Sequence, residues 1–141
     1  MTDPVTIETH VPVPLERAWV AYTDAEAITH WNFASPEWCC PSAQVDLRKG
    51  GRHIARMEAK DGSIGFDFAG TYEEVDAPFA LSLRLDDGRL SRTTFEHRGD
   101  GTRVQTVFDP DASHPAGMQR DGWQAILDNY AAYVGQQERD R

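Results

Sequence analysis

The sequence of 141 residues has little cysteine and no long apolar run. Its two cysteines, Cys39 and Cys40, are neighbours in the chain. Adjacent cysteines cannot close a loop, so we expect no disulfide framework, and unpaired thiols are typical of a reducing cytoplasm. No stretch reaches the roughly 20 apolar residues of a membrane span, and the first residues have neither the basic start nor the apolar run of a targeting segment. The sequence therefore predicts a cytoplasmic protein without a membrane span.

Positive charge is scarce as well. The chain has 14 Lys and Arg residues against 23 Asp and Glu residues, which gives a formal net charge of −9. A domain this acidic repels phosphate backbones and anionic lipid headgroups, and no run of Lys or Arg opposes that repulsion. We therefore expect no nucleic-acid partner.

The sequence also lacks the spacings that bind metals, phosphates or acyl groups. It has no His-x-x-x-His pair and no Cys-x-x-Cys pair, and the adjacent Cys39 and Cys40 have no further soft-metal ligand close to them in the sequence. No serine lies in a Gly-x-Ser-x-Gly motif. Gly50-Gly51 has neither the spacing nor the following Lys of a phosphate loop. We predict no metal, no nucleotide and no covalent cofactor, and we assign no catalytic residue.

What the sequence does contain is enough apolar material for one folded domain. Hydrophobic residues make up 40% of the chain and charged residues 26%, which is an ordinary globular balance. At this length we expect a single domain over residues 1–141. Such a domain buries a sufficient core without metals or disulfides.

An amphipathic segment near the C-terminus is the strongest pattern. Its apolar side chains recur at steps of three and four residues, which is the period of one helical face. They are Trp123, Ile126, Leu127, Tyr130, Tyr133 and Val134. We predict a long helix over residues 115–136, with Ser113 as its N-cap. Such a helix needs a large apolar partner, which must come from the middle of the chain.

The rest of the chain reads mostly as strands. Alternation of apolar and polar residues predicts a first strand over residues 5–11. Pro14, and the capping spacing from Thr23 to Glu26, predict two short helices over residues 14–22 and 24–31. Six more strands, separated by turn residues, are expected at residues 44–48, 52–59, 65–75, 79–85, 90–97 and 102–108. This order predicts an α+β fold, in which a curved antiparallel sheet wraps around the long C-terminal helix.

Residues 32–42 are predicted as a loop, because prolines interrupt them. The loop carries Phe33 and Trp38 as well as both cysteines, which is unusually apolar for a connection that normally runs over the surface. We expect it to fold inward.

Several local strings occur in the order seen in a known family. They are Pro14-Leu-Glu-Arg-Ala-Trp19, Thr23-Asp24 leading to Trp31, Asp46-Leu-Arg-Lys-Gly-Gly51, Phe68-Ala-Gly-Thr-Tyr72 with Val75, Thr94-Phe95-Glu96, and Gly122-Trp123 with Ile126-Leu127. Together with the order of strand, helix pair, meander and long helix, they resemble the START-like superfamily, also called the SRPBCC or Bet v1-like helix-grip proteins. Within it, the chain is similar to the branch related to the activator of Hsp90 ATPase, the AHSA1-like proteins. The resemblance covers essentially the whole chain.

The resemblance implies a cavity between the sheet and the long helix that takes a small apolar or amphipathic molecule. It also places Phe33 and Trp38, together with Trp31, at one mouth of this cavity, where they form either a plain hydrophobic lid or an aromatic gate that contacts a ligand. Relatives include lipid carriers, plant ligand-binding proteins, polyketide cyclases and a cochaperone domain, so the fold does not settle the function. We expect ligand binding, with two alternatives: an enzyme of the cyclase or dehydratase type in the same cavity, and a partner-binding module like the Hsp90 cochaperones. The sequence leaves open whether a reaction is catalysed and whether the protein forms a homodimer.

We place the expected cavity under the N-terminal half of the long helix. The candidate ligand-binding residues are Trp31, Trp38, His53, Met57, Phe68, Phe95, Met118 and Gly122. Gly122 costs the helix roughly 1 kcal/mol relative to Ala, which makes sense either where a ligand needs space or where Trp123 or a strand approaches closely. Met118 nearby adapts to varied apolar shapes. Trp123 is expected on the other side of the helix's apolar face, packed on the sheet. Gly122→Leu is therefore expected to block binding of a hydrophobic probe.

Polar groups in the expected cavity decide between a binding protein and an enzyme. His53 shares the inward face of its strand with Ala55 and Met57, and its partner is either a ligand or a backbone carbonyl. The carboxylates in regular structure are each expected to face solvent, unless one is buried with a shifted pKa as a proton-transfer group. They are Asp46, Asp67, Glu96 and Asp128.

Overall fold

The computed structural model describes residues 3–139. Strand β1 (Val5–Val11) comes first, followed by helices α1 (Leu15–Thr23) and α2 (Ala25–Ile28). The next six elements are strands: β2 (Trp38–Val45), β3 (Arg52–Ala59), β4 (Gly65–Asp76), β5 (Ala80–Leu85), β6 (Leu90–Arg98) and β7 (Gly101–Phe108). Helix α3 (Ala116–Arg139) is the last element. This is the order of elements that the sequence predicts.

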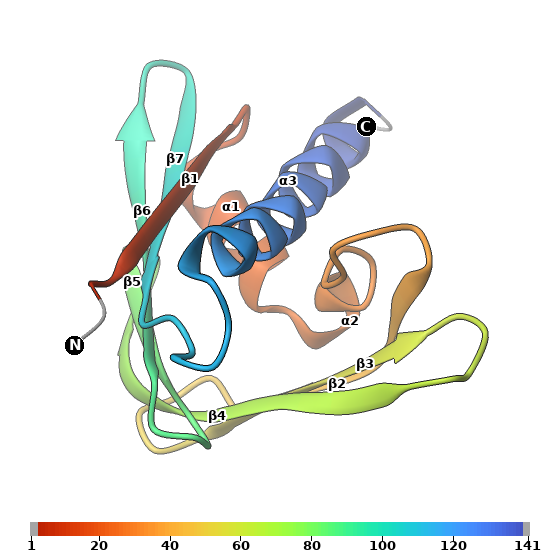
Figure 1. Ribbon diagram of the computed structural model, residues 1–141. Coiled ribbons are helices and arrows are strands. Elements are labelled where there is room, and N and C mark those ends of the chain that lie inside the picture. The colour runs from red at the N-terminus through yellow and green to blue at the C-terminus, as the bar shows by residue number, and fades with distance from the viewer. Residues whose placement is uncertain (1–2, 140–141) are drawn as a thin grey trace.

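The strands form one seven-stranded antiparallel sheet in the order β1-β7-β6-β5-β4-β3-β2. Strands β2 to β7 pair with their sequence neighbours, while β1 pairs with β7, from Val5 opposite Phe108 to Val11 opposite Thr102. The sheet curls around α3, with α1 packed against α3 and α2 packed against β2 (Figure 1). The predicted α+β helix-grip fold, with two short helices after the first strand, is confirmed.

The two short helices are separated by a single capping residue. Asp24 Oδ2 accepts a hydrogen bond from the Ala27 amide at 3.0 Å, so Asp24, rather than Thr23, is the N-cap of α2. Helix α2 ends at Ile28, three residues earlier than the sequence predicts. The chain then turns so that Trp31 is buried and donates from Nε1 to the Ala21 carbonyl oxygen at 3.0 Å. The indole is therefore held against α1 by a turn after the helix and not by the helix itself.

The segment predicted as an inward-folded loop before Ser42 is partly a strand. β2 begins at Trp38, which lies opposite Ala59, and its register with β3 shifts between Cys39 and Ser42. Pro41 lies in this irregularity, and an edge strand tolerates a residue without an amide hydrogen there. The register shift hides the alternation of side chains, which is why the sequence pattern does not indicate a strand.

Helix α3 packs its apolar face into the curve of the sheet. Leu127, Tyr130 and Val134 are buried. The Tyr130 hydroxyl donates to the Ala18 carbonyl oxygen at 2.6 Å, which links α3 to α1. No helix within residues 3–139 is both long and apolar enough to cross a membrane.

The segment between β7 and α3 is folded by side-chain hydrogen bonds. Helix α3 begins at Ala116, so Ser113 is not its N-cap; its hydroxyl donates instead to the Asp111 carboxylate at 2.8 Å. Gln119, in the first turn of α3, accepts from the Asp111 amide at 2.6 Å and donates to the Asp111 carbonyl oxygen at 2.7 Å. These two bonds fasten the segment to the start of the helix.

Candidate functional site

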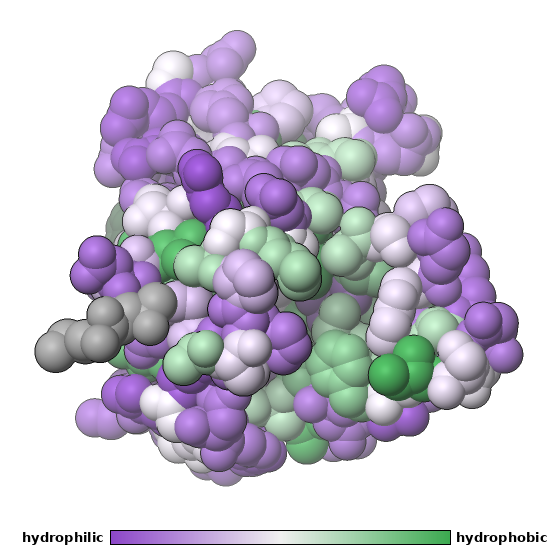
Figure 2. Space-filling view, viewed as in Figure 1, coloured by the Kyte–Doolittle hydropathy of each residue, from purple (hydrophilic) through white to green (hydrophobic). Residues whose placement is uncertain are grey.

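A cavity of about 320 Å³ lies between the concave face of the sheet and helix α3. Strands β3 to β7 supply most of the wall, the first half of α3 covers it, and residues of α1, α2 and the turn after α2 close one side. In Figure 2, apolar side chains gather in a hollow of the surface, with hydrophilic side chains around them. Small-molecule sites usually measure roughly 300–1,000 Å³, so this cavity suits a small ligand.

Aromatic side chains form the apolar part of the wall. Trp123 of α3 stacks on Phe108 with ring centroids 3.9 Å apart, and it meets Phe68 of β4 edge-on at 5.8 Å. Trp31 is held from another side by the ring of Tyr22, whose centroid is 5.2 Å away. Because packing fixes these rings, the cavity presents a preformed apolar surface.

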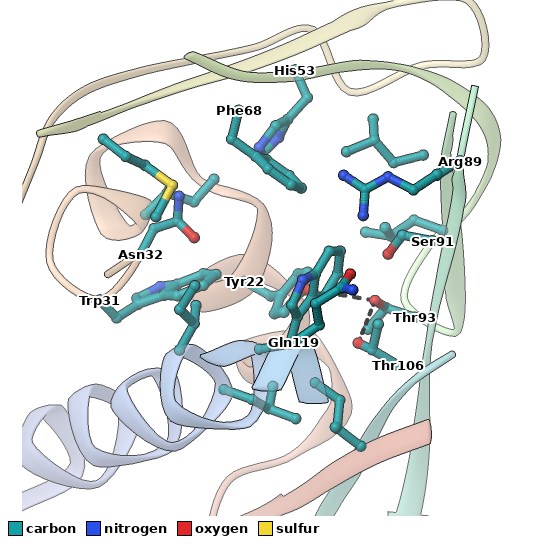
Figure 3. A pocket seen from close by; sticks show the side chains of 18 of the residues that line it. Tyr22, Trp31, Asn32, His53, Phe68, Arg89, Ser91, Thr93, Thr106 and Gln119 are labelled. Atoms are coloured by element: carbon teal, nitrogen blue, oxygen red, sulfur yellow. Dashed lines mark hydrogen bonds between the residues drawn. The ribbon is translucent and has the colours of Figure 1, made fainter. Parts of the chain in front are cut away.

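His53 of β3 points into the cavity (Figure 3). Its Nδ1 lies 3.0 Å from the Tyr72 hydroxyl, and the rings of Phe68 and Tyr72 meet it edge-on at centroid distances of 6.1 and 6.0 Å. Burial lowers the pKa of the His53 imidazole to about 4, because desolvation disfavours the charged form. The imidazole is therefore neutral at pH 7, and its protein partner is a tyrosine hydroxyl rather than the backbone carbonyl considered from the sequence.

A chain of hydroxyl groups crosses the floor of the cavity. The Tyr22 hydroxyl lies 3.3 Å from Thr93 Oγ1, which lies 2.7 Å from Thr106 Oγ1 (Figure 3). Thr93 and Thr106 are only 1% and 2% exposed, and burial raises the pKa of Tyr22. These groups satisfy one another and carry no charge, so the floor is polar but neutral.

Charged side chains gather at one end of the cavity. Arg89 donates from Nε to the Asp87 carboxylate at 2.8 Å, and its Nη1 lies 3.5 Å from the Asp109 carbonyl oxygen. Asp111 and His114 line the same end from the segment before α3. We call these five residues the acidic rim.

Asn32, directly after Trp31, brings an unpaired donor to the cavity wall. Its Nδ2 is buried and has no hydrogen-bond partner within residues 3–139. A buried polar group left unpaired costs about 1–3 kcal/mol, so a ligand acceptor at this atom is favourable. Burial raises the pKa of the nearby Cys40 thiol, so that thiol is a poor nucleophile at pH 7.

Half of the residues that the sequence suggests for ligand binding line the cavity. They are Trp31, His53, Met57 and Phe68. Trp38 and Phe95 lie outside the lining. Trp38 packs edge-on against Phe66 of the wall at 6.0 Å, and Phe95 is buried behind the Tyr22 ring at 5.5 Å.

The two helical candidates also lie outside the lining. Met118 is 63% exposed, and a Cβ atom at Gly122 would meet no heavy atom within 4 Å apart from its chain neighbours and the backbone of its own helix. The face of α3 that covers the cavity carries Trp123, with Gln119 one turn before it and Ile126 and Leu127 one turn after it. The face of α3 that covers the cavity is therefore not the face with Met118 and Gly122 that the sequence suggested. It is the face that carries Trp123.

Sequence reasoning missed several lining residues. Tyr72 continues the alternating row of Phe68 along β4, so extending that row would have identified it. Gln119 lies four residues before Trp123 and so belongs to the same helical stripe, but its polarity removed it from an apolar pattern. No sequence pattern indicates Arg89 as a lining residue, because it lies in a hairpin turn that only the curvature of the sheet brings to the cavity.

The titratable side chains His53, Asp111 and His114 line the cavity, and His114 Nδ1 lies 3.8 Å from the Asp111 carboxylate. The carboxylates considered from the sequence are all exposed: Asp46, Asp67, Glu96 and Asp128. A histidine with a pKa of about 4 is a weak base at pH 7. Within residues 3–139, no three His, Cys, Asp or Glu side chains converge to hold a metal ion.

The chain is similar to a described family and to several solved structures. The family described as "Activator of Hsp90 ATPase homolog 1-like protein" matches residues 12–135. An AHSA1-like protein from Aeromonas hydrophila is 45% identical, with a TM-score of 0.88 over 93% of this chain and 91% of that one. A protein from Cytophaga hutchinsonii is 37% identical, with a TM-score of 0.82 over 99% and 97%. A protein from Chromobacterium violaceum, at 22% identity, shares the fold, with a TM-score of 0.85 over 95% and 99%. No curated protein matches the chain.

Proposed function

The chain belongs to the activator of Hsp90 ATPase homolog 1-like family, and on that premise we propose that it binds a small apolar or amphipathic molecule between the sheet and α3. The observation that carries the proposal is the cavity itself, with its wall of fixed aromatic rings. An apolar ligand there leaves water and gains dispersion contacts with the rings. The family alone does not select this function, because one fold supports many.

The proposal places the protein in the cytoplasm and its ligand in the cavity of this chain. Cys39 and Cys40 are unpaired thiols, as is usual in a reducing compartment. Residues of this chain line the cavity on the side of the sheet and on the side of α3.

Filling the cavity tests the proposal. Ile126→Trp adds a ring to a residue of the cavity face of α3, whereas Val20→Trp adds the same ring to a residue of α1 that is 57% exposed and lies outside the lining. We expect the uncharged fluorescent probe N-phenyl-1-naphthylamine to bind the wild type and Val20→Trp equally. Binding to Ile126→Trp is expected to weaken at least ten-fold, because the probe and the new ring compete for one space.

Equal binding of the probe by both variants would show that this cavity is not the site. Circular dichroism and urea unfolding of Ile126→Trp ensure that a loss of binding is not a loss of fold. Native mass spectrometry of the purified wild type then identifies any small molecule that remains bound.

Partner binding is a second candidate. The tip of the β3–β4 hairpin exposes Ile64 and Phe66, at 58% and 46%, and neighbouring exposed apolar residues are common at interaction surfaces. The family description names an activator of the Hsp90 ATPase. If this chain acts in that way, Ile64→Ser weakens its binding to purified Hsp90 in isothermal titration calorimetry and leaves probe binding unchanged.

A cyclase- or dehydratase-type reaction in the same cavity has less support. It requires a proton-transfer group, and His53, with its low pKa, is the inward candidate. If His53 were catalytic, His53→Ala would abolish turnover of an identified substrate while binding of that substrate persisted.

A further inference from the structure

We propose that the cavity selects an uncharged ligand that carries a hydroxyl group, and that this hydroxyl binds the second ring nitrogen of His53. The inference rests on the proposed function and specifies the chemistry of the ligand. It is carried by the His53–Tyr72 pair, by the unpaired amide of Asn32, and by the acidic rim.

The first step is the hydrogen bonding of His53. Nδ1 lies 3.0 Å from the Tyr72 hydroxyl, and Nε2 has no hydrogen-bond partner within residues 3–139. If Tyr72 donates to Nδ1, then Nε2 carries the proton and donates. If Nδ1 donates to Tyr72, then Nε2 accepts. A hydroxyl both donates and accepts, so it binds Nε2 in either tautomer, whereas a carbonyl binds only one of them.

The second step is the absence of a charged partner around His53. The rings of Phe68 and Tyr72 flank the imidazole, and desolvation keeps it neutral, with a pKa of about 4. A carboxylate moved to this position would lose its hydration without meeting an opposite charge. A hydroxyl loses far less hydration and replaces it with the bond to Nε2.

Asn32 offers a second uncharged contact in the same cavity (Figure 3). Its buried Nδ2 has no hydrogen-bond partner within residues 3–139. An oxygen of the ligand satisfies this donor, and the amide adds no charge. His53 Nε2 and Asn32 Nδ2 thus both match a neutral oxygen.

The acidic rim opposes anionic groups. Its one guanidinium, that of Arg89, already donates to Asp87 at 2.8 Å. Asp109, which accepts from the Leu90 amide at 3.0 Å, and Asp111, which lines the cavity, bring further carboxylates. His114 is the remaining titratable group of the rim and its side chain is 62% exposed. An incoming carboxylate therefore meets a net negative potential at this end.

A matched set of naphthalene ligands tests the inference, since flat rings suit an aromatic wall. 2-Naphthalenemethanol carries the hydroxyl, 2-naphthoate carries a carboxylate, and 2-methylnaphthalene carries neither. We expect the alcohol to bind the wild type at pH 7.5 about ten-fold more tightly than the hydrocarbon, which is the worth of one buried hydrogen bond. Naphthoate is expected to bind more weakly than the alcohol by at least the same factor.

Variants assign the preference to His53. His53→Phe is expected to bind the alcohol and the hydrocarbon equally, while the affinity for the hydrocarbon stays near that of the wild type. His97→Phe, at an exposed position outside the lining, keeps the preference. In the wild type, the ¹⁵N resonance of His53 Nε2 is expected to shift when the alcohol binds and to stay in place when the hydrocarbon binds. The ¹⁵N shift tests the contact between the ligand hydroxyl and His53 even if His53→Phe does not fold.

The outcomes separate this inference from the proposed function. Equal affinity for the alcohol and the hydrocarbon, or tighter binding of naphthoate, would overturn the inference and leave the cavity a binding site. Failure of all three ligands to bind would overturn both.

Discussion

His53 illustrates, at the scale of single residues, how burial alone changes the chemistry of a side chain. It lies among rings and a hydroxyl, and desolvation is the cause that lowers its pKa to about 4. A carboxylate beside it would have raised the pKa instead. At pH 7 the residue therefore acts as a neutral hydrogen-bonding group rather than as a charge.

The low pKa of His53 predicts a specific loss of stability in mild acid. The unfolded chain takes up a proton near pH 6.5, but the folded chain resists protonation until about pH 4. The stability contributed by the neutral imidazole is thus complete above pH 6.5 and is lost as the pH falls toward 4. At pH 5 the loss is about 2 kcal/mol, measured by urea unfolding at pH 7.5 and pH 5.0.

His53→Gln is the control for this effect, because it removes the titrating group. We expect the variant to lose about 2 kcal/mol less than the wild type between the two pH values. His97→Gln, at an exposed position, should behave like the wild type. An identical pH dependence for the wild type and His53→Gln would refute the neutral buried imidazole.

Tyr130 provides a second prediction for a single residue. Its hydroxyl donates to the Ala18 carbonyl oxygen at 2.6 Å, and the side chain is fully buried. Tyr130→Phe removes this bond, while the Ala18 carbonyl, inside α1, keeps its helical partner. The substitution is expected to lower the free energy of unfolding by about 0.5–1.5 kcal/mol. Tyr133→Phe loses only an exposed bond from Gln137 and should change stability by less than about 0.5 kcal/mol. Equal effects of the two substitutions in urea unfolding would contradict this account.

At the scale of elements, helix α3 divides its surface between packing and the cavity. Tyr130 and Val134 of its second half are buried against the fold, while Gln119, Trp123 and Ile126 of its first half line the cavity. Gln119 also holds the segment before the helix. The start of α3 is therefore both the cover of the site and the anchor of its acidic rim.

Gly122 provides a prediction for the helix. A Cβ atom there meets no heavy atom within 4 Å apart from its chain neighbours and the backbone of its own helix, and the residue lies outside the cavity lining. Gly122→Ala is expected to stabilise the protein by up to about 1 kcal/mol, because glycine is a poor helix former. Binding of N-phenyl-1-naphthylamine should be unchanged. The larger Gly122→Leu should also leave binding intact, and loss of binding in that variant would show that the ligand extends along this shoulder.

At the scale of the whole molecule, most ion pairs lie on the outside, and the charged residues of the cavity are confined to the acidic rim. Ion pairs such as Arg52 with Asp86, at 2.6 Å, and Arg92 with Glu74, at 2.9 Å, lie at exposed positions. Pairs of this kind contribute about 0–1 kcal/mol each, so stability rests mainly on the core between the sheet and α3. The sequence also predicts that the fold binds no metal ion.

A chelation experiment tests that statement for the whole protein. Because no three potential ligands converge within residues 3–139, dialysis against EDTA is expected to leave the Tm unchanged. Elemental analysis should find no stoichiometric zinc or copper. A fall in Tm that added zinc restores would reveal a metal site that neither the sequence spacing nor the geometry indicates.

The sequence by itself determined the kinds of elements and their order. Helix α3 and the strands from β3 to β7 follow from patterns within each segment, because the period of the apolar residues depends on local backbone geometry. Those patterns also place His53, Met57 and Phe68 on inward faces. They fail where a segment is irregular. The register shift near Pro41 conceals the part of β2 before Gln44, and α2 ends at Ile28, before the predicted Trp31.

Only the tertiary structure decided which residues share the cavity. The shoulder of α3 that faces the sheet is set by contacts with distant elements, such as Trp123 with Phe68 and Phe108. The curl of the sheet brings Arg89 of a hairpin turn near Asp111, and the pairing of β3 with β4 places Tyr72 beside His53. Periodicity records which side of an element is apolar, but the rotation and crossing of elements depend on how their side chains interlock. That packing joins residues far apart in the chain, so no local pattern contains it.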